Sequence, residues 1–492
     1  GACAKQTFDA TDPYTWSQFQ SELRRNSPFA SKAEMTNFIL KRINRVYARM
    51  EPNRHILKRD LEDGLFFFYD KSNFTQLDIS YTVLYREGKK VVTREQSVPL
   101  VKVLQQLDLP VYERIEFEPN PHALHPRCFN VWRDFKAVDL IVAGEKQSLD
   151  EVVQEPCFIR LKRFFMENVC NDHEPSFRQL MRILQLKLTR PWEKVEGISV
   201  LMAKQGTGKN LFYDFMCEYV LGKELCHQGT GIQVFTGNFN YHLMGKLLVF
   251  ADEMAATKEQ FHAQWQAMKN VSSSKHLAIN KKFADVTVVR NLFYCFFATN
   301  NRNAVSLDVS DRRFDIITMN GVYANDTAYF KELIAKCWNQ HTGNLFFTWL
   351  RHTHEFDDVD YRKRVDTSVR RELIHLSMPS PLKFLVSVKK QRAVDRDCGG
   401  DSNRLSKQYY NASHFYFMFK QWTLRKGEKL VSQTAFGNAV SEHIIKKKSR
   451  GLIVYDIDSI TVPDNHDDDL QEVQDEAAIH PDTEFALPSV NF

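Results

Sequence analysis

The chain has 492 residues, of which 43% are hydrophobic, and its 66 Lys and Arg slightly outnumber its 61 Asp and Glu. This length suits two to four domains of about 150 residues, with a globular composition. No run reaches the ~20 apolar residues of a membrane-spanning helix, and the nine cysteines lack paired spacing. We therefore expect a soluble protein in a reducing compartment, the cytoplasm or nucleus of a host, and exclude a disulfide scaffold.

The two ends of the chain differ in character. The first residues, Gly1 to Lys5, contain no initiator Met and no apolar signal core, which leaves a fragment, a processed product and a trimmed form as alternatives. The stretch from Asp464 to Phe492 holds nine acidic residues and no Lys or Arg, so the remainder has 66 basic and 52 acidic residues, a charge of +14. This asymmetry predicts a polyanionic partner and a disordered tail, with an ordinary solvated surface as the alternative.

The first 150 residues have the pattern of a mixed α/β region. Apolar residues at helical spacing between Lys32 and Met50 predict a helix. Short strand-like runs follow at Leu65–Tyr69, Ser80–Tyr85 and Lys90–Val92. A second helical region is expected from Glu155 to Leu188, and it ends just before a proline.

Three continuous apolar runs stand in the middle of the chain. Runs of this kind, alternating with helices, are typical of parallel strands buried on both faces of a sheet. We expect helices after Lys209 and after Thr257 to cover that sheet, with Gly222 ending the first. The predicted fold class is therefore α/β. The three strands are Ile198–Met202, Leu247–Ala251 and Phe293–Thr299.

The C-terminal part has the pattern of helices followed by a small mixed module. Residues 321–378 are mainly helical in pattern. A helix through Phe415 and Trp422 precedes a second helix near Ser432 and a strand pair around 446–456. Helix, helix and basic hairpin, in this order, are typical of a winged-helix module.

A glycine-rich turn follows the first apolar run. The stretch from Gly206 to Lys209 joins a strand to a helix, which is the arrangement of a phosphate-binding P-loop. The backbone N–H groups of such a turn attract anions, and the lysine adds a charge for the β- and γ-phosphates of ATP. Two positions depart from the usual motif: Ala203 replaces its first glycine, and Asn210 replaces the Ser or Thr whose hydroxyl binds Mg²⁺.

The second and third apolar runs end in polar residues. Asp252 and Glu253 follow the second run, at the sheet edge where α/β folds bind ligands. One carboxylate can hold Mg²⁺ and the other can polarise an attacking water, although a capped helix start has the same pattern. Asn300 follows the third run and can orient that water; an Asn at a strand end is also a common turn former.

Basic residues follow and interleave with these strands. Arg312 and Arg313 can stabilise a γ-phosphate in trans, and a local salt bridge with Asp311 is the alternative. Lys281 and Lys282 lie near the tip of an expected hairpin, which suits contact with a nucleic-acid backbone. A plain solvated hairpin is the alternative there.

Two further groups of residues carry weaker signals. The lysines from Lys446 to Lys448 make the C-terminal hairpin basic and can contact phosphates, with a solvated charge run as the alternative. Cys157, Cys170 and His173 lack the close spacing of zinc ligands, so we expect no zinc site from them.

The ordered set of motifs resembles superfamily 3 helicases, in particular the primase-helicase branch of poxviruses, other large DNA viruses, phages and mobile elements. Upstream, Phe129–Trp132 and Leu188–Pro191 resemble segments that precede the ATPase of that branch, and Phe415–Asp456 resembles its winged helix. The similarity covers about residues 30–460. The motifs are Gly206-Thr-Gly-Lys209, Asp252-Glu253, Lys281-Lys282, Thr299-Asn300 and Asp311-Arg312-Arg313.

The resemblance implies an AAA+-like P-loop core that uses ATP and Mg²⁺ and acts as a homo-hexamer on single-stranded DNA or a DNA fork. A replication primase or polymerase is a further expected partner. Residues 1–150 show no convincing Asp-x-Asp catalytic strand, so we expect no priming activity in this chain. The implied catalytic residues are Asp252, Glu253, Asn300, Arg312 and Arg313, and the implied Mg²⁺ ligands are Asp252 and Asn210. The implied nucleotide-binding residues are Gly206, Thr207, Gly208, Lys209 and Asn210. The implied nucleic-acid contacts are Lys281, Lys282, Lys446, Lys447 and Lys448.

We therefore expect an ATP-dependent helicase or translocase of DNA replication that hydrolyses ATP at the subunit interfaces of a ring. Two alternatives remain: an ATP-binding nucleic-acid or assembly module whose hydrolysis is weakened at Asn210, and a protein-remodelling P-loop ATPase. The expected segments are an N-terminal α/β region (1–150), a helical collar-like segment (151–194), the ATPase core (195–320), a helical extension (321–378), a winged-helix-like domain (379–460) and a disordered acidic tail (461–492).

Overall fold

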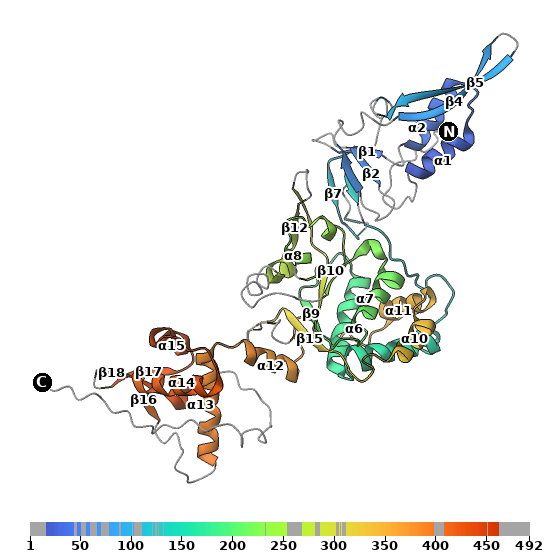
Figure 1. The fold of residues 1–492 in the computed structure, drawn as a ribbon. Coiled ribbons are helices and arrows are strands. Elements are labelled where there is room, and N and C mark those ends of the chain that lie inside the picture. The colour runs from blue at the N-terminus through green and yellow to red at the C-terminus, as the bar shows by residue number, and fades with distance from the viewer. Residues whose placement is uncertain are drawn as a thin grey trace. The chain divides into compact units, whose positions relative to one another are not determined.

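The computed structural model of the chain divides into two compact units, which are described separately (Figure 1). Unit 1 comprises Gly1–Ala304 and Arg312–Val365, and unit 2 comprises Val305–Asp311 and Asp366–Phe492. Among the described residues, no helix is both long enough and apolar enough to cross a bilayer. The described residues are 16–43, 47–50, 56–59, 66–69, 78–87, 90–100, 102, 111–120, 122–123, 125, 127–130, 132–231, 233–252, 268–280, 286–301, 305, 307, 311–397, 408–449 and 451–461.

Two helices and a long hairpin form the first core of unit 1. Helices α1 (Trp16–Asn26) and α2 (Lys32–Ile43) share buried apolar residues with the antiparallel hairpin of β4 (Asp78–Glu87) and β5 (Lys90–Pro99). The prediction for α2 is confirmed, because apolar residues at helical spacing form its buried face. The buried residues at that spacing are Met35, Phe38 and Ile39.

The first predicted helix is nevertheless too long. It ends at Ile43, and Tyr47–Met50 forms the strand β1 instead. β1 lies between β2 (Ile56–Arg59) and β6 (Val111–Tyr112) in a four-stranded sheet that β3 (Phe66–Tyr69) completes. Pairing with these neighbours outweighs the helical spacing, because tertiary contacts override intrinsic propensity. A separate parallel pair joins β7 (Arg114–Glu116) and β8 (Cys128–Asn130).

The helical region predicted from Glu155 to Leu188 is interrupted. Asn171 and Asp172 both have left-handed backbone conformations, with φ of 52° and 57°. A right-handed helix cannot pass through two such residues, so one helical segment ends before them and another begins after them. The elements are α4 (Leu149–Val153), α5 (Pro156–Arg163), the π-helical turn η2 (Phe164–Val169) and α6 (Glu174–Thr189).

A five-stranded sheet in the order β10-β11-β14-β9-β15 forms the centre of unit 1, and every neighbouring pair is parallel. The three predicted strands are confirmed. The sequence analysis missed β10 and β15, because only the first residue of β10 is buried and Asp315 interrupts the apolar run of β15. The strands are β9 (Ile198–Met202), β10 (Cys226–Thr230), β11 (Leu248–Asp252), β14 (Tyr294–Thr299) and β15 (Phe314–Thr318).

Helices from three parts of the chain share one apolar core with this sheet. The ring of Phe165 in η2 stacks on Phe346 of α11, with centroids 5.2 Å apart. Gly222 follows η3 with a φ of 98°, so the predicted end of the first covering helix is confirmed. The predicted helix after Thr257 falls largely outside the described residues. The remaining elements are α7 (Lys209–Phe215), η3 (Met216–Leu221), η4 (Lys223–Leu225), α8 (Gln233–Thr236), η5 (Tyr241–Leu243), α10 (Thr327–Cys337) and α11 (Gln340–His352).

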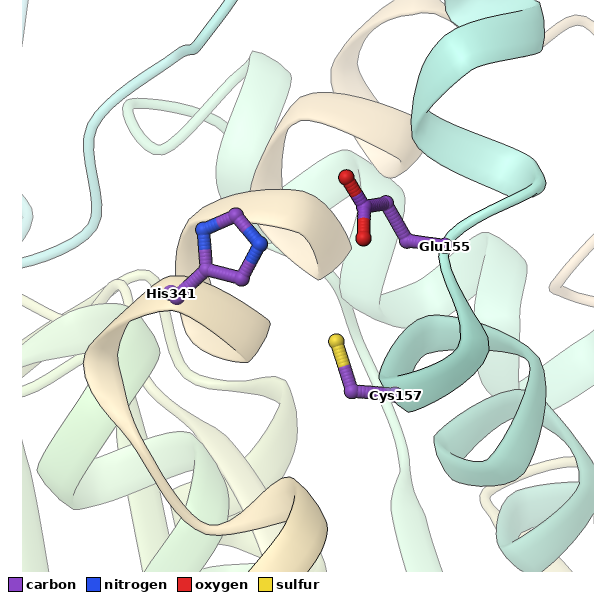
Figure 2. A group of neighbouring side chains, drawn as sticks. All are labelled: Glu155, Cys157 and His341. Atoms are coloured by element: carbon purple, nitrogen blue, oxygen red, sulfur yellow. The ribbon is translucent and has the colours of Figure 1, made fainter.

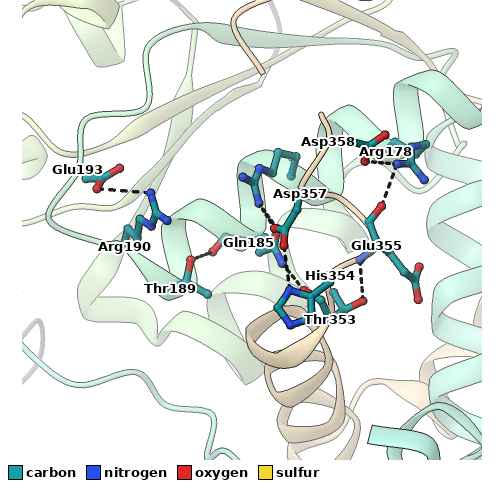
Figure 3. Close-up of polar contacts among 11 residues, drawn as sticks. Arg178, Gln185, Thr189, Arg190, Glu193, Thr353, His354, Glu355, Asp357 and Asp358 are labelled. Atoms are coloured by element: carbon teal, nitrogen blue, oxygen red, sulfur yellow. Dashed lines mark hydrogen bonds and ion pairs between the residues drawn. The ribbon is translucent and has the colours of Figure 1, made fainter. Parts of the chain in front are cut away.

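Polar contacts fasten α6 to the loop that follows α11 (Figure 3). Arg178 donates to the Glu355 carbonyl at 2.8 Å and pairs with Asp358 at 2.5 Å. Farther along α6, Gln185 donates its amide to the Thr353 carbonyl at 2.8 Å (Figure 3). These contacts satisfy backbone carbonyls of an irregular loop and hold it on the helix.

A buried ion pair fixes the start of β15. Asp315 Oδ2 lies 3.2 Å from Arg364 Nη1, and the two side chains are only 3% and 5% exposed. The same guanidinium donates from Nε to the Arg312 carbonyl at 2.7 Å and from Nη2 to the Glu196 carbonyl at 3.1 Å. Arg364 therefore ties the segment before β15 to the segment before β9.

Unit 2 contains the elements predicted for residues 405–460. An apolar core, with Phe384 and Phe415 among its members, joins three helices to a sheet in the order β16-β18-β17. Gly427, with a φ of 65°, ends α14, and Ser432 caps α15. The elements are α12 (Ser368–Ser377), α13 (Ser380–Asp397), β16 (Tyr409–Asn411), α14 (Ala412–Lys426), α15 (Gln433–Val440), β17 (Ile445–Ser449), β18 (Leu452–Asp456) and η7 (Ile457–Ser459).

Replacing Arg364 by Ala should lower the free energy of unfolding of unit 1 by about 3–5 kcal/mol, because buried Asp315 loses its charge partner. Urea unfolding followed by circular dichroism measures this loss. Lys223→Ala is the matched control, since it removes an exposed pair with Glu218 and should cost less than about 1 kcal/mol. Equal losses in the two variants would contradict the stabilising role assigned to the buried pair.

Candidate functional site

The glycine-rich turn joins β9 to α7 at the carboxyl edge of the sheet. Gly206 and Gly208 have φ values of 78° and 82°, which side-chain-bearing residues rarely adopt. Their surroundings also require glycine: a Cβ on Gly206 would lie 2.0 Å from Asn325 Oδ1, and one on Gly208 would lie 2.7 Å from a ring carbon of Phe330. Thr207 is buried and its hydroxyl donates to the Lys204 carbonyl at 2.9 Å.

Lys209 and Asp252 meet at this edge. Lys209 Nζ lies 2.5 Å from Asp252 Oδ1, and the two side chains are 20% and 21% exposed. The sheet topology explains the meeting: Asp252 is the last residue of β11, and Lys209 opens the helix after β9, with only β14 between these two parallel strands. A cation and a carboxylate that are only partly exposed, beside a turn of glycines, form a site able to bind a phosphate and its counter-cation.

The other strand ends lie along the same edge. Asp252 stands opposite Ala298 of β14, and Thr299 stands opposite Met202 of β9. Asn300 follows β14 directly and is exposed. The predicted grouping of strand-end residues is therefore found for Lys209, Asp252 and Asn300.

The remaining positions singled out in the sequence are exposed, buried or outside the described residues. Asn210 is exposed in the first turn of α7. Ala203 is buried, and its backbone N–H donates to the Thr299 carbonyl at 3.0 Å. Glu253, Lys281 and Lys282 lie outside the described residues, so their predicted roles stay predictions.

Arg312 and Arg313 lie at the opposite edge of the sheet. They precede β15, whose first residue, Phe314, stands opposite Ile198, the first residue of β9. The glycine-rich turn follows the other end of β9, a separation of about 16 Å for five residues at about 3.3 Å each. Both arginines are exposed. The fold thus does not bring them to the glycine-rich turn of their own chain.

The predicted hairpin is present as β12 (His276–Ile279) and β13 (Thr287–Arg290), paired antiparallel. The sequence analysis missed how its stem is held. Lys187 of α6 donates to the Leu292 carbonyl at 2.6 Å, and Lys194 donates to the Phe293 carbonyl at 2.7 Å. Burial lowers the pKa of both lysines, that of Lys194 to about 8. A lysine within the apolar sequence Leu186-Lys-Leu188 is the signal that could have indicated such a buried contact.

The three lysines of β17 in unit 2 are exposed but differ in their contacts. Lys447 donates to the Tyr409 hydroxyl at 3.0 Å and to Asp456 at 3.3 Å, and these hydrogen bonds raise its pKa. Lys446 donates to the Gly437 carbonyl at 3.0 Å. Lys448 also lies on this strand, which presents positive charge to solvent.

Residues 201–313 match the model of a protein family described as "Family of unknown function (DUF5906)". A DNA primase-polymerase of Nitratiruptor phage NrS-1 is 28% identical over 130 residues, which are 25% of this chain and 17% of that protein. The match therefore spans less than a fifth of the phage protein's own length.

Solved structures of the C-terminal region of NrS-1 resemble this chain over most of its length. One apo structure of that region (305–718) has a TM-score of 0.56 and 15% identity, and covers 84% of this chain and 96% of its own. An A form apo structure of the same region has a TM-score of 0.55, 14% identity and coverages of 85% and 96%. The chain thus has an α/β fold with a five-stranded parallel sheet that resembles the NrS-1 C-terminal region.

Proposed function

We propose that this protein is an ATP-driven helicase or translocase of DNA replication, with ATP hydrolysed between the subunits of a ring. The observation that carries the proposal is the pairing of Lys209 with Asp252 at 2.5 Å beside a turn of two left-handed glycines. Lysine and carboxylate at such a turn are the groups that a P-loop site uses for phosphate and Mg²⁺.

In this proposal the nucleotide separates the ion pair. Lys209 turns to the β- and γ-phosphates, while the N–H groups from Gly206 to Lys209 and the helical segment of α7 and η3 hold them. Asp252 then faces Mg²⁺, with the Asn210 carbonyl oxygen as a second ligand. Glu253 polarises the attacking water, and Asn300 at the same edge orients it.

Ring assembly follows from the position of the arginines. Arg312 and Arg313 are exposed at the edge opposite the glycine-rich turn, so they suit the phosphate site of a neighbouring copy rather than their own. The buried Arg364 holds the backbone of Arg312, so the exposed guanidinium groups extend from a fixed position of the backbone. An arginine placed in trans makes hydrolysis depend on assembly.

Single-stranded DNA is the strand along which the protein is proposed to move. The stem of the β12–β13 hairpin is anchored by Lys187 and Lys194, and the sequence between its two strands contains Lys281 and Lys282. A lysine-bearing hairpin fixed to the ATPase sheet can grip a phosphate backbone. The winged-helix assignment of unit 2, with its lysines on β17, supplies a second basic surface. Similarity to part of a phage DNA primase-polymerase supports a role in replication.

ATP turnover in the presence of Mg²⁺ should rise when single-stranded DNA is added, and Lys209→Ala should reduce it at least about 100-fold because the phosphate charge loses its partner. Phosphate release measures turnover, and fluorescent nucleotide measures binding. Turnover equal to that of Lys209→Ala would refute the enzyme proposal. Nucleotide binding without turnover would favour the weakly hydrolysing alternative, and turnover indifferent to DNA would favour a protein-remodelling ATPase.

The trans role of the arginines can be tested by mixing two inactive variants. Lys209→Ala retains Arg312 and Arg313, whereas the double variant Arg312→Ala, Arg313→Ala retains Lys209. At equal amounts, about a quarter of the interfaces should combine an intact turn with intact arginines and regain hydrolysis. A mixture as inactive as its components would contradict action in trans, provided that both variants still assemble in analytical ultracentrifugation.

Binding to a single-stranded oligonucleotide should weaken with salt, because Lys–phosphate contacts release counter-ions. Removing Lys281 and Lys282 together should reduce the slope of log affinity against log salt by about 1.4, which is about 0.7 per phosphate contact. Fluorescence anisotropy measures this slope. Lys223→Ala, an exposed lysine away from the hairpin, serves as the control, and the same slope in all proteins would contradict the hairpin contact.

A further inference from the structure

We propose that Glu155, Cys157 and His341 form a binding site for a single transition-metal ion, with Zn²⁺ as the best-suited one. Their ligand atoms all lie within 4.8 Å of one another (Figure 2). Figure 2 shows the carboxylate, the thiol and the imidazole converging between the start of α5 and the start of α11. This set is separate from the Lys209–Asp252 site and from the residues Cys170 and His173 considered in the sequence.

Two helix starts hold the three side chains. Glu155 is the N-cap residue of α5, and Cys157 lies in the first turn of that helix. His341 lies in the first turn of α11, which is capped by the Asn339 side chain. The two helices are packed together: the rings of Phe158 and Trp349 lie 5.2 Å apart, edge to face. Closer to the ligands, Cys337 Sγ contacts the Cys157 carbonyl at 3.5 Å, so the chain just before α11 lies against the start of α5.

The donor set has the chemistry of a zinc site. Imidazole nitrogen, thiolate sulfur and carboxylate oxygen bind Zn²⁺ at about 2.0–2.3 Å in tetrahedral geometry, which puts donors about 3.3–3.8 Å apart. The ligand atoms lie at most 4.8 Å apart, so side-chain rotation needs to bring them closer by no more than about 1.5 Å. Three protein ligands leave a fourth position for water.

Lys146 supports the carboxylate. Its Nζ lies 2.5 Å from Glu155 Oε1, so Oε2 remains for a metal bound through one oxygen. Ligand carboxylates in metal sites are commonly hydrogen-bonded in this way. The thiolate and carboxylate together balance the two charges of the ion.

The thiol of Cys157 is also reachable. Cys157 lines a cavity of about 620 Å³ that Arg160 and Tyr329 also border. The neighbouring Cys337 is different: it is buried, and its Sγ contacts the Cys157 carbonyl at 3.5 Å. Of the two thiols, the half-buried Cys157 is therefore the one accessible to a metal ion.

Cys170 and His173, which the sequence analysis set aside as zinc ligands, have other surroundings. His173 Nδ1 lies 2.9 Å from Ser176 Oγ, a local contact at the start of α6. Cys170 is fully buried, and burial raises its thiol pKa. Neither residue belongs to a group of three donors in the described part of the chain.

Titration of the untagged full chain with Co²⁺, a spectroscopic stand-in for Zn²⁺, tests the site. One equivalent should produce a thiolate-to-cobalt charge-transfer band that Zn²⁺ then removes. Cys157→Ser should abolish the band, and His341→Ala should weaken binding at least about tenfold while the band remains at saturation. Because His341 is exposed, the His341→Ala variant should keep its fold. Circular dichroism checks that it does.

Two controls keep the result specific. Cys217→Ser removes a half-buried thiol elsewhere, and His354→Ala removes an exposed histidine, so both should bind Co²⁺ like the unaltered protein. Absence of the band at one equivalent, or a band that persists in Cys157→Ser, would overturn the proposal. Loss of affinity in the controls equal to that in His341→Ala would identify adventitious binding and would overturn it as well.

Discussion

Parallel pairing of the five central strands is the constraint on which unit 1 depends. Because neighbouring strands run in the same direction, their carboxyl ends meet at one edge, and the residues after them become neighbours in space. Lys209 and Asp252 are far apart in the chain, yet the register places them 2.5 Å apart. A one-residue slip of β11 would turn Asp252 toward the other face of the sheet. The chemistry of the edge is thus a consequence of backbone hydrogen bonding.

Sequence patterns predicted those parts of the fold whose signal is local. Ile198–Met202 is buried at every position, so its apolar run alone identifies the strand. β10 has no such run, since its place at the edge of the sheet leaves His227 and Gly229 partly exposed. The turn at Gly206–Lys209 was predictable because its backbone requires glycine. The support from Arg364 was not, because its partners, the Asp315 carboxylate and several backbone carbonyl groups, come near it only in the folded chain.

The cluster at the start of α5 illustrates the same limit. Metal sites are recognised in sequences by close spacing of ligands, and Cys157 has only Glu155 nearby in the chain. His341 comes from a helix after the whole sheet, and the contact of Cys337 with the Cys157 carbonyl shows that the chain just before this helix lies against the start of α5. Spacing therefore predicts sites built within one segment, whereas sites built between helices follow from the core.

The residues of the proposed phosphate site and the proposed trans arginines lie at opposite edges of the sheet. The glycine-rich turn and Asp252 stand at the carboxyl edge, whereas Arg312 and Arg313 precede β15 at the amino edge. The stem of the β12–β13 hairpin also enters the sheet at the amino edge, directly before β14. Lys187 and Lys194 bind the carbonyls at that point, so the hairpin cannot shift without moving α6 or breaking buried hydrogen bonds. In the proposed mechanism, a change at the nucleotide site would reach the hairpin through rigid strands, and the arginines at the same end would link the hairpin to a neighbouring subunit.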